Sequence, residues 1–204
     1  MRIEQLKPSQ RVQGRWLAVM EDGSILRIGE GEVIDFALYA GKELEDEEAN
    51  CLVRSARRTG LGQKAMDLLT RRPMSRQELE RRLKEWEADE EETAAICDRM
   101  ERLGFLDDEQ YARQVVRHYS ARGCGQRRLR DELYRRGVPR ELWEQALEQA
   151  QDPAAAIDAF LEKKLKGSRD PGELKKASDA LARRGFGWSE ISEGLRRCGV
   201  DVED

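Results

Sequence analysis

The sequence predicts a mainly α-helical protein, built as a tandem array of three three-helix repeats behind a small α+β module that contains a β-hairpin. Three observations lead to this fold class: a hairpin signature near the N-terminus, evenly spaced helix start and stop signals after it, and equivalent leucines that recur along the chain. The expected divisions are residues 1–62, 63–104, 105–151 and 152–204.

The first segment contains a strand pattern. Residues 11–28 read as two short apolar strands around Asp22-Gly23, a dipeptide suited to a tight hairpin turn. A short helix is expected from Gly31 to Ala40, closed by Gly41. A second helix is expected from the apolar stripe of Ala49, Leu52, Val53 and Ala56. We expect Gly60-Leu61-Gly62 to separate this module from the repeats.

Helix boundaries are marked throughout the rest of the chain. Ser75 with Glu78 forms a capping box, and Asp107 with Gln110 offers a similar arrangement. Asp152-Pro153 and Asp170-Pro171 each place a capping carboxylate before a proline at the first helical position. Glycines that follow apolar-periodic runs predict helix ends at Gly104, Gly123, Gly137, Gly167, Gly185 and Gly199.

These boundaries reveal an internal repeat. Leu83, Leu133 and Leu181 occupy equivalent places in three middle helices. The last two begin the related segments Leu-Tyr-Arg-Arg-Gly-Val and Leu-Ala-Arg-Arg-Gly-Phe. Each unit is too small to bury its apolar face alone, so we expect neighbouring units to pack together. Such units are similar to winged-helix modules without a wing.

Composition limits the function classes. The 204 residues are 38% charged and 39% hydrophobic, and the formal net charge of −4 gives no general attraction to nucleic acids. Cys51, Cys97, Cys124 and Cys198 lie too far apart for a zinc or redox motif. No stretch reaches the roughly 18 apolar residues of a membrane span. We therefore expect a reduced, cytoplasmic protein without membrane association.

Catalytic signatures are absent from the sequence. The single histidine, His118, lies beside a helical apolar stripe without a nucleophile motif nearby, so a solvent or partner contact is expected. There is no phosphate-binding glycine loop. Helix capping accounts for the adjacent Asp107 and Asp108 without a metal. We expect a protein that is not an enzyme and that uses no cofactor.

The four tryptophans are expected to close packing between helices or units, because each lies in the apolar strand or at a helix junction. They are Trp16, Trp86, Trp143 and Trp188.

The strongest candidate binding feature is a group of arginines in the middle unit, since guanidinium forks bind phosphates and carboxylates alike. Its members are Arg113, Arg117, Arg122, Arg127, Arg128, Arg130, Arg135 and Arg136. Some have acidic neighbours at helical spacing: Arg127 with Asp131, Arg128 with Glu132, Asp131 with Arg135, and Glu132 with Arg136. A self-paired, solvated face is therefore an alternative. Arg113, Arg117, Arg122 and Arg130 lack such neighbours and are the better candidates for an external contact.

A longer motif in the same region resembles the central signature of the RecX family. It consists of Gly104–Arg113, Val115–Arg117, Arg122–Gly125 and Arg128–Val138. The similarity extends from about Ala65 to Val200, and the N-terminal module resembles the extension of many Gram-positive members. The chain departs from the family at Cys124–Gln126, where basic or proline-bearing stretches are common.

The resemblance implies three tandem three-helix repeats and a non-enzymatic regulator of the RecA recombinase. Such a protein would bind the RecA–DNA filament, change RecA ATP hydrolysis, filament growth and strand exchange, and most simply inhibit them. The expected partners are RecA and single- or double-stranded DNA, with the protein itself monomeric. The alternative is a helix-turn-helix-like DNA-binding regulator, which would place one helix in the major groove.

Overall fold

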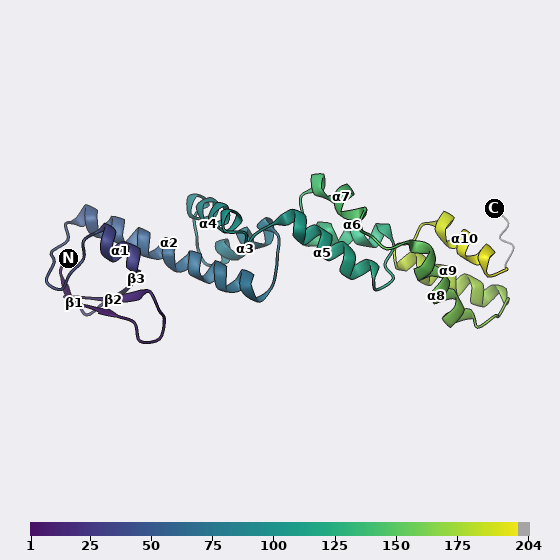
Figure 1. Cartoon of the computed structure of the whole chain (residues 1–204), viewed down its shortest axis with the longest axis horizontal. Coiled ribbons are helices and arrows are strands. Elements are labelled where there is room, and N and C mark those ends of the chain that lie inside the picture. The colour runs from purple at the N-terminus through teal and green to yellow at the C-terminus, as the bar shows by residue number, and fades with distance from the viewer. Residues whose placement is uncertain (200–204) are drawn as a thin grey trace. The chain divides into compact units, whose positions relative to one another are not determined.

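The computed structural model describes residues 1–199 (Figure 1). This part of the chain is mainly helical, with ten α-helices, one 3₁₀ helix and a three-stranded antiparallel sheet at the N-terminus. It forms two compact units: residues 1–72 with 79–105, and residues 73–78 with 106–199. Within residues 1–199, no helix combines the length and the apolarity needed to cross a bilayer.

The sheet has the order β1-β2-β3, formed by Ile3–Pro8, Arg15–Met20 and Ile25–Gly29. The hairpin around Asp22-Gly23 is confirmed, because β2 pairs with β3 and Gly23 adopts a φ of 79°. The Asp22 carboxylate accepts a hydrogen bond from the Ser24 amide at 2.9 Å, which closes the turn. The first strand was not predicted, since it has only one fully buried side chain.

The helices after the sheet differ from the sequence prediction. Helix α1 covers only Glu30–Asp35, because Ala37 adopts a positive φ and ends it. Helix α2 spans Asp46–Arg71, so it continues without interruption through residues 60–62, where we expected the module to give way to the repeats. Glycine costs a helix about 1 kcal/mol relative to alanine. The buried side chains of Ala56, Leu61 and Ala65 on either side hold the helix together across that point.

Glu32 joins α1 to α2 through a buried carboxylate. It accepts hydrogen bonds from the Thr59 hydroxyl, the Ser55 hydroxyl at 3.0 Å and the Gly29 amide at 2.8 Å. Burial alone would raise the pKa of Glu32, but these three hydrogen bonds outweigh it and lower the pKa below its ordinary value.

This lowered pKa predicts a loss of stability in acid. The charged form contributes stability above the unfolded-state pKa of 4.5, and that contribution disappears as the pH falls through the lower folded-state pKa. Urea denaturation from pH 6 to pH 3 should therefore show a shallower decline for Glu32→Gln than for the natural chain. Equal slopes would contradict this role.

The first repeat uses the second half of α2 with α3, Arg76–Glu85, and α4, Glu90–Arg102. Asp89 caps α4 by accepting a hydrogen bond from the Glu92 amide at 2.8 Å. The acidic side chains in the first turn of α4 are favoured there by the helix dipole. The buried side chains of the first repeat include Leu61, Ala65, Leu69, Leu79, Leu83, Ile96, Cys97 and Met100.

The second and third repeats form the second unit, together with residues 73–78. The second contains α5, Asp108–Ser120, and α6, Gln126–Arg135, followed by a 3₁₀ turn η1, Arg140–Leu142, that leads into the short α7, Trp143–Leu147. The third contains α8, Pro153–Leu165, α9, Pro171–Arg183, and α10, Trp188–Arg197. The second and third repeats each have a separate cluster of buried apolar side chains.

The predicted helix ends are confirmed in detail. Asp107, Asp152 and Asp170 each accept a hydrogen bond from a backbone amide in the following turn, at 2.8–2.9 Å. The Ser75 hydroxyl accepts one from the Glu78 amide at 3.1 Å. The six C-terminal glycines all have positive φ: Gly104, Gly123, Gly137, Gly167, Gly185 and Gly199.

The repeated leucines define the core of each repeat. Leu83, Leu133 and Leu181 are fully buried, as their equivalent positions predict. The tryptophan prediction is only partly correct. Trp143 packs against the core of the second repeat and donates to the Val138 carbonyl at 2.9 Å, but Trp188 is 58% exposed because it occupies the first turn of α10.

A close backbone contact joins the second repeat to the third. The Gly125 amide donates to the Arg184 carbonyl at 2.9 Å, and the Arg127 amide donates to the Gly185 carbonyl at 3.1 Å. The first amides of α6 are thereby satisfied by the turn after α9. A Cβ on Gly125 would lie 2.5 Å from the Gly185 backbone, so both positions require glycine. We call this contact the repeat joint.

The N-terminal turn of α3 makes a related contact within the second unit. The Ser75 hydroxyl donates to the Arg136 carbonyl, and a Cβ on Gly137 would lie 2.1 Å from the Gln77 side chain. Gly137 thus occupies the place that Gly185 has in the repeat joint, four residues after the buried leucine. The same position in the first repeat is Glu87, which adopts a φ of 62°. In the third repeat, α9 begins ten residues before its leucine, whereas α3 and α6 begin seven residues before theirs.

Candidate functional site: the arginine surface of the middle repeat

All eight candidate arginines lie in α5, in the turn after it, or in and just after α6. The structure divides them into two groups. Five have acidic or hydroxyl partners within the chain, namely Arg113, Arg128, Arg130, Arg135 and Arg136. The other three, Arg117, Arg122 and Arg127, are exposed and form no ion pair within the described residues.

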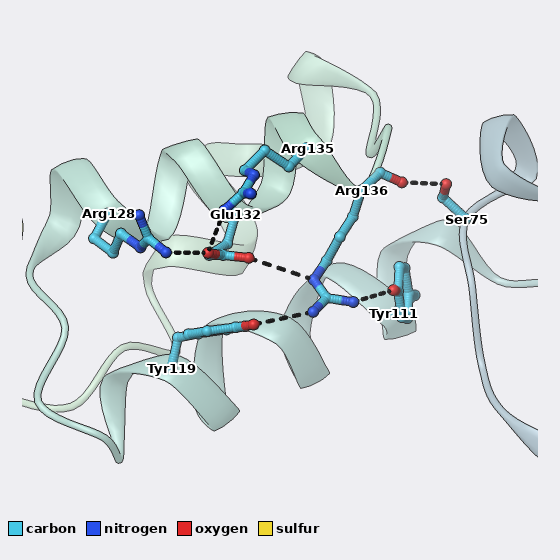
Figure 2. Close-up of polar contacts among 7 residues, drawn as sticks. All are labelled: Ser75, Tyr111, Tyr119, Arg128, Glu132, Arg135 and Arg136. Atoms are coloured by element: carbon cyan, nitrogen blue, oxygen red, sulfur yellow. Dashed lines mark hydrogen bonds and ion pairs between the residues drawn. The ribbon is translucent and has the colours of Figure 1, made fainter.

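The first group centres on Glu132, which is only 5% exposed (Figure 2). Its carboxylate lies 2.8 Å from the Arg128 guanidinium, and Arg135 and Arg136 approach it at 3.4 and 3.8 Å. The predicted pairs of Glu132 with Arg128 and Arg136 are therefore confirmed. Arg135 joins Glu132 in place of the predicted Asp131, because the buried carboxylate is the one that faces it.

Arg136 is a structural residue. Its guanidinium donates to the hydroxyl groups of Tyr111 at 2.9 Å and Tyr119 at 3.0 Å, which ties α6 to α5 (Figure 2). Burial lowers the pKa of Arg136, but the two tyrosine hydrogen bonds outweigh it and the pKa is raised overall. Arg136 is thus held as a cation between α5 and α6.

Two of the four arginines predicted to lack partners have them. Arg113 pairs with Glu109, one turn earlier on α5, so the sequence interpretation overlooked an acid at helical spacing. Arg130 pairs with Glu144 of α7 at 3.1 Å and with the Gln126 amide oxygen at 3.0 Å. The pair with Glu144 could not be predicted from sequence spacing, because Glu144 is fourteen residues away and approaches only in the folded repeat.

The exposed arginines are the remaining candidates for an external contact. Within residues 1–199, no hydrogen bond or ion pair engages the side chains of Arg117, Arg122 or Arg127. Arg127 therefore does not form its predicted pair with Asp131. Arg117 lies in the last turn of α5, Arg122 in the turn after it and Arg127 in the first turn of α6, so all three lie at one connection.

The repeat joint adds cations from the third repeat to this surface. A shallow hollow of about 340 Å³ lies between Arg127, Arg128 and Arg183. A second hollow of about 730 Å³ is lined by Gly123 and Ala121 on one side and by Lys163 and Lys164 on the other. The sequence interpretation missed these third-repeat residues, because only the joint brings them close to the α5–α6 connection.

Arg184, which also lines the larger hollow, stacks on the Phe160 ring, with its guanidinium carbon 4.4 Å from the ring centroid. A stacked guanidinium keeps its outer N–H groups available to an acceptor while its position is held.

The arginine surface presents guanidinium groups, which can bind anionic groups. His118 is exposed and lies edge-on to the Tyr119 ring, with 5.1 Å between ring centroids. In the described part of the chain, no group of three or more histidine, cysteine, aspartate and glutamate side chains is arranged to hold a metal. The four cysteines are unpaired.

Comparison with known proteins identifies the family. Residues 63–100 match the model of the first three-helix domain of RecX, and residues 107–147 match that of the second. The chain is 35% identical to regulatory protein RecX of Pseudomonas entomophila over 143 residues, which is 69% of this chain and 91% of the relative. It is 34% identical to that of Xanthomonas axonopodis over 145 residues, covering 70% and 88%.

Solved structures agree with this result at the level of the fold. A crystal structure of regulatory protein RecX superposes with a TM-score of 0.75 at 20% identity, over 96% of this chain and 98% of the other. RecX from Lactobacillus salivarius superposes with a TM-score of 0.65 at 19% identity, over 70% and 96%. On the evidence of its matched domains and its relatives in sequence, the chain belongs to the RecX family of regulatory proteins.

Proposed function

We propose that the protein binds the RecA–DNA filament through the surface around the repeat joint and inhibits RecA ATP hydrolysis, filament growth and strand exchange. The observation that carries the proposal is the set of exposed arginines, Arg117, Arg122 and Arg127, with the third-repeat cations beside them. The protein acts as a regulator and not as an enzyme.

Charge distribution supports a local contact. The chain has a net charge of −4, so attraction to a polyanion or an acidic protein face must come from a patch. Among residues 1–199, no acidic side chain pairs with Arg117, Arg122 or Arg127, and guanidinium groups bind carboxylates and phosphates in two-point geometry. The five arginines with partners contribute little, since surface ion pairs already occupy four of them and Arg136 is held inside.

The repeat architecture supports a periodic partner. Backbone hydrogen bonds at the joint hold the second and third repeats in one arrangement, so their cations are presented together. Contacts that are weak individually then accumulate without a single strong site. A filament of identical subunits offers such repeated contacts, and the surface can bridge neighbouring subunits.

Removing the exposed arginines is expected to abolish most of the inhibition. The variant is Arg117→Gln, Arg122→Gln and Arg127→Gln, and the measurement is single-stranded-DNA-dependent ATP hydrolysis by RecA as each protein is titrated. The natural chain should inhibit below one molecule per RecA. The variant should require at least about tenfold more protein, because three charge-assisted contacts are lost.

The matched control removes three paired arginines from the same repeat: Arg113→Gln, Arg130→Gln and Arg135→Gln. It changes the net charge equally, so it should inhibit nearly as well as the natural chain. Equal weakening by both triple variants would show that only net charge matters and would contradict the proposed surface. No inhibition by the saturating natural protein would contradict RecA binding. A steep salt-dependent affinity for duplex DNA alone would instead support the DNA-binding regulator.

A further inference from the structure

The first unit contains a cleft that the proposed function does not use. It lies between the β2–β3 hairpin, the middle of α2 and the turn after α3, and it has a volume of about 490 Å³. Small-molecule sites in proteins are commonly about 300–1,000 Å³. The cleft is therefore large enough for one ligand of the size of a nucleotide.

Cations outnumber acids around this cleft. Arg15, Arg27, Arg57 and Lys64 line it, against Asp67 and Glu87. One acid and one cation are already engaged. Asp67 accepts a hydrogen bond from Gln63 at 2.9 Å, and Arg57 lies 3.5 Å from Glu92 while it also donates to the Glu87 carbonyl.

The two hairpin arginines are free. Across residues 1–199, neither Arg15 nor Arg27 has a side-chain hydrogen bond or an ion pair, although Arg15 is half-buried. They extend from adjacent strands, β2 and β3, at positions two pairs apart in the register, which places both on the same face of the sheet. Two neighbouring guanidinium groups without an internal acceptor suit an anion such as phosphate.

One wall of the cleft is aromatic. Trp86 is half-buried beside it, and the Lys64 ammonium lies 5.6 Å from the centroid of the Trp86 ring. An aromatic face next to free cations is the combination with which proteins bind nucleotides, because the ring stacks on the base while the cations hold the phosphate. An acidic peptide would use the cations alone and leave the ring without a role.

The floor of the cleft contains Gly60, in the middle of α2. Glycine at such a position costs about 1 kcal/mol relative to alanine. Packing does not require it, since a Cβ at Gly60 would meet nothing within 4 Å, in contrast to Gly125 at the repeat joint. The missing side chain leaves the helix surface bare where it faces the cleft, which allows a flat group to approach the backbone.

We infer that this cleft binds a nucleotide, with the phosphate on Arg15 and Arg27 and the base between Trp86 and the bare helix surface at Gly60. The Lys64 ammonium moves from the ring to the phosphate when the base enters. The ligand is a free nucleotide or one unit of a single-stranded nucleic acid, since both have the same chemistry. The inference does not depend on RecA binding, because the exposed arginines lie in the other unit.

The test uses the full chain in the background of the triple variant Arg117→Gln, Arg122→Gln and Arg127→Gln, which removes binding through the arginine surface. Affinity for a fluorescein-labelled dT15 oligonucleotide is measured by anisotropy, and affinity for thymidine 5′-monophosphate by calorimetry. Adding Arg15→Gln and Arg27→Gln should weaken oligonucleotide binding at least about tenfold. The control, Arg71→Gln with Arg81→Gln, removes two exposed arginines of the same unit away from the cleft and should change affinity by less than about twofold.

Gly60→Ala separates binding from folding. It should raise the melting temperature by about 2 °C, because alanine favours the helix and meets no neighbour. It should also weaken oligonucleotide binding at least about fivefold, because the new methyl group occupies the floor of the cleft. A more stable variant with reduced affinity cannot be explained by misfolding.

The outcomes are distinct. Binding of both thymidine 5′-monophosphate and dT15 supports a free nucleotide as ligand, and binding of dT15 alone supports a strand. Unchanged binding in the Arg15/Arg27 and Gly60 variants would overturn the inference. So would displacement of dT15 by a poly-glutamate peptide but not by thymidine 5′-monophosphate, since that would identify an acidic peptide as the ligand. Failure of RecA inhibition would leave these results unaffected.

Discussion

Replacement of Gly125 by alanine is expected to lower the free energy of unfolding by about 2–3 kcal/mol and to separate the second repeat from the third. The new Cβ would lie 2.5 Å from the carbonyl group of Gly185 and from the Phe186 amide nitrogen. Backbone atoms cannot rotate out of the way as a side chain can, so the two repeats must move apart. Urea denaturation should show the loss, with the single transition becoming broader as the repeats unfold less cooperatively.

Gly187→Ala is the matched control. Gly187 is also an extended glycine at the N-terminus of a helix, α10, but a Cβ there would meet only side-chain oxygens at 3.4 Å and beyond. Both substitutions replace an N-cap glycine by alanine, so both lose a similar capping preference of about 0.5–1 kcal/mol. A larger loss at position 125 therefore measures the close approach alone, and equal losses would refute the repeat joint as we describe it.

Glu132→Ala is expected to destabilise the second repeat by about 3 kcal/mol. The substitution leaves Arg136 inside the repeat without a countercharge and also removes the common partner of Arg128 and Arg135. Removal of one member of a buried ion pair costs roughly 3–5 kcal/mol, and we take the lower end because the arginine side chains are one-third exposed or more. Chemical denaturation measures the effect.

The adjacent Asp131 provides the comparison, since Asp131→Ala removes an acid of the same helix that is exposed. The free energy of unfolding of the Asp131→Ala variant should stay within about 0.5 kcal/mol of that of the natural chain. The stability of the Glu132→Gln variant should lie between those of the Glu132→Ala and Asp131→Ala variants, because the amide oxygen can still accept one guanidinium hydrogen bond. Equal effects of Ala at positions 131 and 132 would mean that Glu132 is only another surface charge.

The sequence was informative wherever local chemistry determines the structure. Capping by Asp107, Asp152 and Asp170 depends on a side chain and an amide only a few residues apart, and each was identified correctly. The repeat was equally accessible, because the fully buried Leu133 and Leu181 stand in related segments. The hairpin followed from its turn residues alone.

The errors arose where tertiary contacts override local preference. Gly60 and Gly62 read as a boundary, but the buried residues around them keep α2 continuous. Arg130 lacked a neighbour in the sequence and found Glu144 in space. The burial of Glu132, which removes Arg136 from the candidate surface, also depends on how α6 packs on α5. Half of the favoured arginines were therefore misjudged, while Arg117 and Arg122 remain.

The first and third repeats lack, at their outer ends, the residues that form the repeat joint. This difference prevents further units from being added through the same contact. Glu87 stands where Gly137 and Gly185 leave no room for a Cβ, so the first repeat cannot accept the helix start of another unit in that way. Helix α9 begins three residues further from its leucine than α3 and α6 do. The backbone amide at the position equivalent to Gly125 therefore lies inside α9 instead of at its start, where a further unit could accept its hydrogen bond. Copies of the chain therefore cannot polymerise end to end by repeating their own internal contact, which is the hazard of any open, head-to-tail interface.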